Sequence, residues 1–101
     1  MVYKILKYAV VDDDEIVNTI VYYETISLIL ALRFETNIEH AFDELETNPE
    51  NYFNLDDKKH RRIIIKGFPY AFIYCIEGAS VLIKMLFPLL ENPKKLLIGL
   101  R

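Results

Sequence analysis

Cysteine, glycine, proline and tryptophan are scarce in this sequence. The 101 residues include one cysteine (Cys75), three glycines, four prolines and no tryptophan. A single cysteine excludes an internal disulfide and a cysteine-based zinc site, so we expect Cys75 to be a small buried hydrophobe. Few glycines and prolines, beside 27% charged residues, argue against a disordered chain. With 52% hydrophobic residues, the chain can bury about two-thirds of its unfolded surface in one core.

Long hydrophobic runs are absent as well. The longest stretch without a charge is residues 67–76, which is ten residues, against the roughly 20 that cross a bilayer. Two lysines interrupt the N-terminal apolar residues, which argues against a signal peptide. His40 and His60 are not spaced as a helical metal pair. We therefore expect a cytoplasmic protein with one domain over residues 1–101, no membrane contact, no metal and no cofactor.

Charge is divided unevenly along the chain. Residues 1–57 hold three basic and thirteen acidic residues, a net charge of −10. Residues 58–101 hold nine basic and two acidic residues, a net charge of +7. This separation can give a folded domain one acidic and one basic face, and the basic face would suit nucleic acid or an acidic protein. Alternatively, the two halves pair with each other across the fold and largely cancel.

The N-terminal half has the pattern of a strand followed by helices. Residues 2–11 alternate and are rich in β-branched and aromatic residues, which predicts a strand. The acidic residues 12–15 favour a helix start over a calcium or magnesium site, because the glycine and distal glutamate of an EF-hand are missing. Asn48 and Pro49 end the helical part. Two apolar stripes precede them, first Ile16, Ile20 and Tyr23, then Phe34, Ile38, Ala41, Phe42 and Leu45. The pattern leaves open whether they form one bent helix or two.

In the C-terminal half, the spacing of the apolar residues changes from the period of a helix to that of a strand. After a polar loop over residues 50–57, with His60 also in an exposed loop, strands are expected at residues 61–66, 70–76 and 80–87. Turns separate these strands, and Pro88 ends the last one. In the middle strand, Tyr70, Phe72 and Tyr74 alternate with smaller residues, and we expect core packing rather than a platform for nucleic-acid bases. The order indicates an α+β fold, an antiparallel sheet with helices on one face.

These elements resemble the RelE/ParE family, the toxins of bacterial type II toxin–antitoxin pairs. The resemblance rests on the order and spacing of four segments that together cover nearly the whole chain. They are Val21-Tyr22-Tyr23-Glu24-Thr25-Ile26-Ser27; Arg33-Phe34 with Phe42, Leu45 and Asn48-Pro49-Glu50-Asn51-Tyr52; Arg61-Arg62-Ile63 to Phe68-Pro69-Tyr70-Ala71-Phe72-Ile73-Tyr74; and residues 82–87 with Asn92-Pro93-Lys94-Lys95. The resemblance implies a β-α-α-β-β-β fold with a helical hairpin, and a cognate antitoxin as partner.

Members of this family have one of two activities. The residues at the end of the last predicted strand indicate which of the two this chain has. RelE-like members are ribosome-dependent mRNA endonucleases, whereas ParE-like members inhibit DNA gyrase. Cleaving RNA without a metal requires a base, an acid and cations around the phosphate. Pro88 stands where the nuclease branch usually has a histidine, and Leu90 and Glu91 stand where it has bases. A missing acid or base costs roughly 10²–10⁴-fold in rate. We therefore favour a ParE-like inhibitor with no catalytic residue.

The candidate residues for binding the target or the antitoxin are cationic or aromatic: Arg61, Arg62, Lys66, Tyr70, Lys94 and Lys95. Two alternatives remain open, an endonuclease that uses Arg62 and Lys66 on phosphate, and an interaction domain without toxicity. The basic cluster Lys58-Lys59-His60-Arg61-Arg62 can also be a solvated loop beside a protected sheet edge. The apolar residues 96–100 can pack on the domain, dock an antitoxin or join a homodimer.

Overall fold

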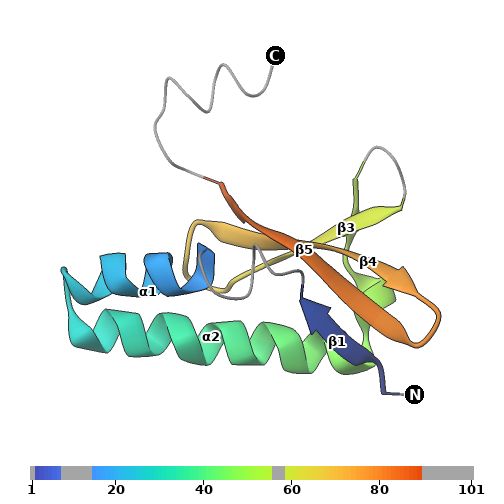
Figure 1. Ribbon diagram of the computed structural model, residues 1–101, viewed down its shortest axis with the longest axis horizontal. Coiled ribbons are helices and arrows are strands. Elements are labelled where there is room, and N and C mark those ends of the chain that lie inside the picture. Colours follow the sequence, from blue (N-terminus) through green and yellow to red (C-terminus); the bar gives the residue numbers. More distant parts are fainter. Residues whose placement is uncertain (1, 8–14, 56–58, 90–101) are drawn as a thin grey trace, which may run out of the picture.

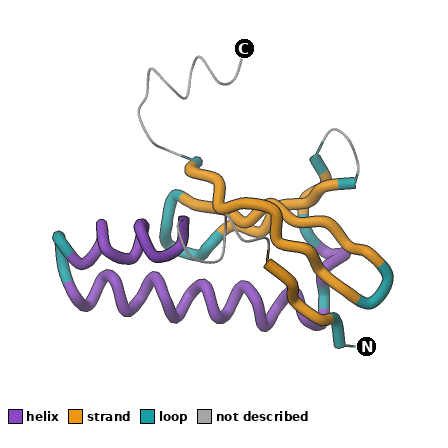
Figure 2. Tube along the Cα trace, viewed as in Figure 1, coloured by secondary structure: helices purple, strands orange, loops and turns teal. Residues whose placement is uncertain are grey.

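The computed structural model describes residues 2–7, 15–55 and 59–89. The elements are β1 (Lys4–Lys7), α1 (Ile16–Glu24), α2 (Leu28–Thr47), a short 3-10 helix η2 (Pro49–Asn51), β2 (Phe53–Asn54), β3 (His60–Ile64), β4 (Tyr70–Glu77) and β5 (Ser80–Pro88). The strands form one sheet in the order β1-β5-β4-β3-β2. The two helices lie side by side on one face of this sheet, and their connected end projects beyond it (Figures 1 and 2). The α+β architecture with a helical hairpin is therefore confirmed.

The helical region is two helices, and Ser27 starts the second. Ser27 has extended backbone angles, and its hydroxyl accepts a hydrogen bond from the Leu30 N–H at 3.3 Å. This contact satisfies one of the free N–H groups in the first turn of α2. The predicted stripe of α2 faces the core, with Phe42 partly buried and Ala31 as an additional buried position. Neither helix is long and apolar enough to cross a membrane, among the residues that the structure describes.

The sheet differs from the prediction in two details. β1 pairs with β5 in parallel, with Lys4 opposite Ser80, so the sheet is mixed rather than wholly antiparallel. The expected polar loop after α2 contains η2 and the short edge strand β2, which pairs with β3. The predicted strand over residues 2–11 is observed as β1, and its end beyond Lys7 lies outside the described residues.

A β-bulge at Lys84 changes which side chains of β5 face the helices. Tyr74 pairs with Ile83, but Ile73 pairs with Met85, so β5 holds one extra residue at this point. Val81 and Ile83 are buried before the bulge, and Leu86 is buried after it. Without the extra residue, strict alternation would place Met85 rather than Leu86 on the helix side. Met85 therefore lies on the sheet face that the helices do not cover.

Aromatic rings join the helical hairpin to the turn between β3 and β4. Tyr23 of α1 and Phe34 of α2 lie 5.1 Å apart between ring centroids, and each lies about as close to Phe68 of the turn. Tyr70 completes the group at 5.8 Å from Phe34. Edge-to-face and tilted pairs at such distances add roughly 0.5–1.5 kcal/mol each beyond the area that they bury. The predicted core role of Phe72 and Tyr74 is also confirmed, since both are fully buried.

Glu15 has a different role from the one that its sequence position suggested. It precedes α1 but makes no side-chain cap there. Instead, its carboxylate accepts a hydrogen bond from the Leu86 N–H of β5 at 3.1 Å. The register of β1 ends opposite Ile83, so β1 does not reach the N–H of Leu86. The acid therefore satisfies a strand donor rather than the helix start. The other acids of this run, residues 12–14, lie outside the described residues.

Candidate functional site

The two adjacent arginines of β3 lie on opposite faces of the sheet. Arg61 pairs with Tyr74, a core residue on the helix side. Arg62 pairs with Ile73 of β4 and with Phe53 of β2 on the other face. Successive side chains of a strand point in opposite directions, so these cations cannot act on one ligand in the same place. The basic cluster of the sequence is thus divided between the two faces.

Arg61 holds the segment that follows α2. Its guanidinium donates hydrogen bonds to the carbonyl oxygen of Glu50 at 3.0 Å and to that of Tyr52 at 2.9 Å. The carboxylate of Glu50 accepts a hydrogen bond from the Tyr3 hydroxyl, which ties the same turn to the residue before β1. Since a guanidinium can satisfy several carbonyl groups at once, these contacts give Arg61 a structural role.

Arg62 lies over an aromatic ring on the uncovered face. Its guanidinium carbon is 4.9 Å from the centroid of Phe53, which is within the range of a cation–π contact. His60 begins β3 opposite Cys75, and so the prediction of an exposed loop at His60 was wrong. The β3 ladder continues through His60 because β4 is long enough to pair with it. His60 and Arg62 are two residues apart in one strand and share the uncovered face.

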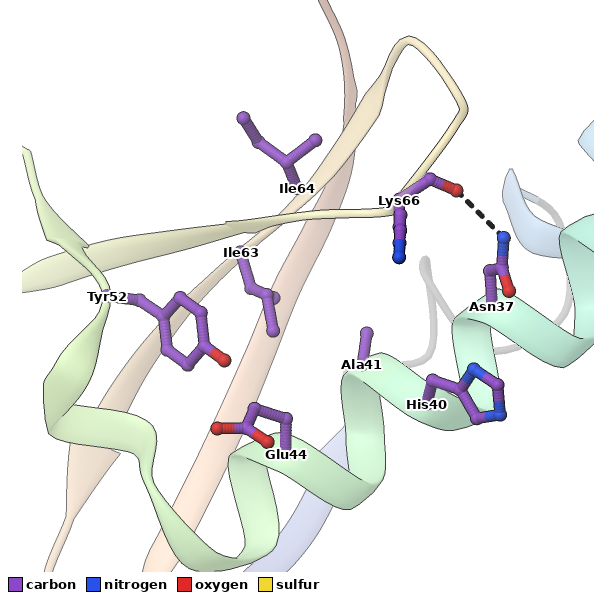
Figure 3. A pocket seen from close by; sticks show the side chains of 8 residues that line it. All are labelled: Asn37, His40, Ala41, Glu44, Tyr52, Ile63, Ile64 and Lys66. Atoms are coloured by element: carbon purple, nitrogen blue, oxygen red, sulfur yellow. Dashed lines mark hydrogen bonds between the residues drawn. The ribbon is translucent and has the colours of Figure 1, made fainter.

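Lys66 lies at a pocket between α2 and β3, on the helix side. The pocket has a volume of about 170 Å³ and is lined by Asn37, His40, Ala41, Glu44, Tyr52, Ile63, Ile64 and Lys66. Figure 3 shows Tyr52 and Glu44 at one end and Lys66 and Asn37 at the other, with Ile63 and Ala41 between them. The Asn37 side-chain amide donates to the Lys66 carbonyl at 2.8 Å, which fixes the turn after β3 against α2. His40 is exposed.

The size of this pocket limits what it can bind. Ligand pockets commonly enclose about 300–1,000 Å³, and this pocket is smaller than that. Partial burial, and then a hydrogen bond to the Glu44 carboxylate, raise the pKa of the Tyr52 hydroxyl. The Tyr52 hydroxyl is the donor of this hydrogen bond, and the Glu44 carboxylate accepts it. The pocket can take one side chain of a protein partner, with a cation at one end and a carboxylate at the other.

The remaining predicted site residues do not join this pocket. Tyr70 is half-buried in the aromatic group with Tyr23 and Phe34, which gives it a packing role. Lys94 and Lys95 lie outside the described residues, as do residues 96–100 of the apolar tail. Cys75 is fully buried, as predicted, and its thiol lies 3.9 Å from the Glu77 carboxylate. No group of three or more metal-binding side chains occurs in the described part of the chain.

Beside His60 and Arg62, the uncovered face of the sheet is lined by apolar side chains. Ile64 is 51% exposed and Phe87 is 44% exposed, and they share this face because each pairs with Ala71. The cross-strand register places further apolar side chains on it: Leu6, Ile73, Leu82 and Met85. The water-facing side of a sheet covered on one face is normally polar. A contiguous apolar surface of this kind is typical of an interface with another molecule.

Sequence reasoning missed Phe53 as a partner of Arg62. Phe53 was expected in a polar loop, and only the pairing of β2 with β3 brings its ring under the guanidinium. An aromatic residue beside Tyr52 in an otherwise polar segment was the one available signal. The separation of Arg61 from Arg62 could have been derived from strand alternation alone.

The comparisons with known proteins support the fold. No family model matches the sequence, and no curated protein matches it. Among solved structures, the chain is similar to one described as the chromosomal ParDE TA system from P. aeruginosa. The TM-score is 0.69 at 10% sequence identity, and the match covers 86% of this chain and 96% of the other. The α+β fold of this chain is therefore a ParE-like fold.

Proposed function

We propose that this chain is the toxin of a type II toxin–antitoxin pair, and that it inhibits growth by binding a protein target, with DNA gyrase as the first candidate. The fold supports the toxin class, since its structural neighbour comes from a ParDE TA system. The observation that carries the proposal is the apolar uncovered sheet face with Ile64 and Phe87. An antitoxin segment would cover this face and hold the chain inactive.

The positions of the cations favour binding over hydrolysis. Arg61 is committed to the carbonyl groups of Glu50 and Tyr52, so it is not directed at a phosphate. Pro88 ends β5 where the nuclease branch usually has a histidine. The described part of the helical layer is strongly acidic, which opposes contact with the ribosome. These features support an inhibitor that acts in a stoichiometric complex.

A second candidate function rests on His60. This imidazole lies on the same sheet face as Arg62, two positions away in β3. A general base and a phosphate-binding cation on one surface are two of the three groups that RNA cleavage requires. A ribosome-dependent endonuclease is therefore the alternative, with His60 and Arg62 as its residues.

Expression of the chain alone in a bacterial host tests the proposal. We expect growth arrest, and recovery when the neighbouring upstream reading frame is co-expressed. The purified chain should inhibit gyrase supercoiling, and primer extension on translated mRNA should show no codon-linked cuts. Unaffected growth contradicts the toxin assignment. Codon-linked cuts that disappear in His60→Gln support the endonuclease instead.

A pair of matched variants tests the antitoxin surface. Ile64→Asp places a charge on the uncovered sheet face and should abolish rescue by the antitoxin. Ala79→Asp is the control because Ala79 is exposed in the turn between β4 and β5, at the opposite end of β4 from the Ile64–Ala71 pair, and gains the same charge there. Equal rescue of both variants would place the antitoxin elsewhere on the chain.

A further inference from the structure

One side of α2 changes from apolar to acidic along its length. Leu28, Leu32, Glu35, Glu39 and Asp43 follow one another at intervals of four, three, four and four residues, which places them in a single stripe. All five are exposed, and Leu28 and Leu32 are exposed by 63% and 54%. We call these five residues the outer stripe. It spans about 22 Å, or roughly four helical turns.

The apolar end of the outer stripe lies at the projecting end of the hairpin, which the sheet does not cover (Figure 1). Other large apolar side chains of the same hairpin are also about half exposed or more: Val17, Val21, Tyr22, Ile26 and Ile29. Single exposed hydrophobic residues are common on monomers, but a cluster of this number typically marks an interaction site.

The acidic end of the outer stripe is unfavourable for an isolated helix. Glu35, Glu39 and Asp43 are like charges at intervals of four residues, and such pairs destabilise a helix. Acids toward the C-terminus of a helix also oppose its dipole, and the last turn of α2 holds no basic residue. Within the described residues, none of the three carboxylates makes a side-chain hydrogen bond or an ion pair. A cationic partner would relieve both effects.

We infer that the outer stripe binds an amphipathic helix of a protein partner, with apolar residues against Leu28 and Leu32 and lysines or arginines against Glu35, Glu39 and Asp43. An anionic membrane and a nucleic acid would both be repelled by these acids. A second copy is disfavoured as well. A parallel pairing of two stripes would oppose acid to acid, and an antiparallel pairing would bury the acids against leucines.

This inference goes beyond the proposed function. The outer stripe belongs to the helical layer, whereas the proposed antitoxin surface is the uncovered face of the sheet. The evidence for the stripe is its pattern of exposure and charge, and its test uses the purified chain with no measurement of toxicity.

Two synthetic peptides test the inference. Both have 18 residues and identical leucine positions at helical spacing, but one carries lysines and the other glutamates at its polar positions. Fluorescence anisotropy measures their binding to the purified chain at low and high salt. We expect the lysine peptide to bind at least about tenfold more tightly, and added salt to weaken it.

Variants of the chain locate the binding. Leu28→Gln/Leu32→Gln should weaken the lysine peptide about tenfold or more, because the apolar contact is lost. Glu39→Gln should weaken it about two- to fivefold. Glu77→Gln changes the net charge equally at the exposed β4–β5 turn and serves as the matched control. Circular dichroism confirms that each variant is folded.

Three results would overturn the inference. Equal binding of both peptides would show that charge does not select the partner. An equal loss in Glu77→Gln and Glu39→Gln would show general attraction to an acidic protein. Sedimentation of the free chain as a dimer that Leu28→Gln/Leu32→Gln dissolves would identify a second copy as the occupant.

Discussion

The Tyr74 hydroxyl donates a hydrogen bond of 2.6 Å to the Pro49 carbonyl, and both residues are buried. This contact joins the middle of β4 to the turn that follows α2. Arg61 holds the next residues of the same turn through the Glu50 and Tyr52 carbonyl groups. The sheet is therefore attached to the end of the helical layer by hydrogen bonds as well as by apolar packing.

Tyr74→Phe should lower the free energy of unfolding by about 1–3 kcal/mol. The ring would still fill its site, but the Pro49 carbonyl would stay buried without its donor. Urea unfolding followed by circular dichroism measures the change. Tyr22→Phe is the control, because Tyr22 is 57% exposed and should tolerate the loss of its hydroxyl. Equal stability of Tyr74→Phe and the parent chain would contradict this role.

The same tyrosine predicts a loss of stability in alkali. Burial raises the pKa of Tyr74 above its usual value of about 10, although the nearby Arg61 acts in the opposite direction. The folded state thus keeps a proton that the unfolded chain releases, so this contribution is complete below about pH 10 and is lost as pH rises above it. The stability difference between the parent and Tyr74→Phe should narrow between pH 9 and 11. A constant difference across that range would argue against the mechanism.

Ser27→Ala should destabilise the chain by about 0.5–2 kcal/mol. The substitution removes the acceptor for the Leu30 N–H at the start of α2. Ser27→Asp keeps an acceptor at the same position, so it should restore most of the stability in thermal unfolding. If both substitutions have the same effect, the cap is not the cause.

Arg61→Ala and Arg62→Ala should have different effects, although the residues are adjacent. Arg61→Ala leaves two carbonyl groups without a donor and should cost about 1–3 kcal/mol in urea unfolding. Arg62→Ala loses only the contact with Phe53, which is worth about 0.5–1 kcal/mol at an exposed site. Its larger effect should appear as weaker antitoxin binding in calorimetry. Similar stability losses in both variants would show that Arg62 is also structural.

Most of the fold could be predicted from the sequence because its signals are local. The stripe of Phe34, Ile38 and Leu45 has the helical period, and Asn48 with Pro49 ends that period. The parallel pairing of β1 with β5 could not be predicted, because it depends on residues about 76 positions apart. The bulge at Lys84 carries no glycine or proline to mark it. The parallel pairing and the bulge both depend on contacts between strands that exist only once the sheet has formed.

Less of the candidate site than of the fold could be predicted from the sequence. The sequence places Arg61 and Arg62 side by side in one basic cluster, but successive side chains of a strand point to opposite faces, which separates them. Phe53 reaches Arg62 only because β2 pairs with β3. The sequence shows that α2 carries many acidic residues. It does not show which of them are exposed, because that depends on how the helical hairpin packs on the sheet.

The position of β1 has a consequence for how the protein is made. Among the described strands, β1 pairs with β5 alone, and the backbone N–H of Tyr3 also bonds to the Glu46 carbonyl at 2.6 Å. During synthesis β1 leaves the ribosome early, yet its partner strand is complete only after Pro88 has been added. β1 is therefore made well before its partner β5. Until β5 is complete, β1 has no partner strand and β4 lacks one of its two neighbours. Chaperones and premature aggregation therefore compete for the unpaired strand edges of the nascent chain.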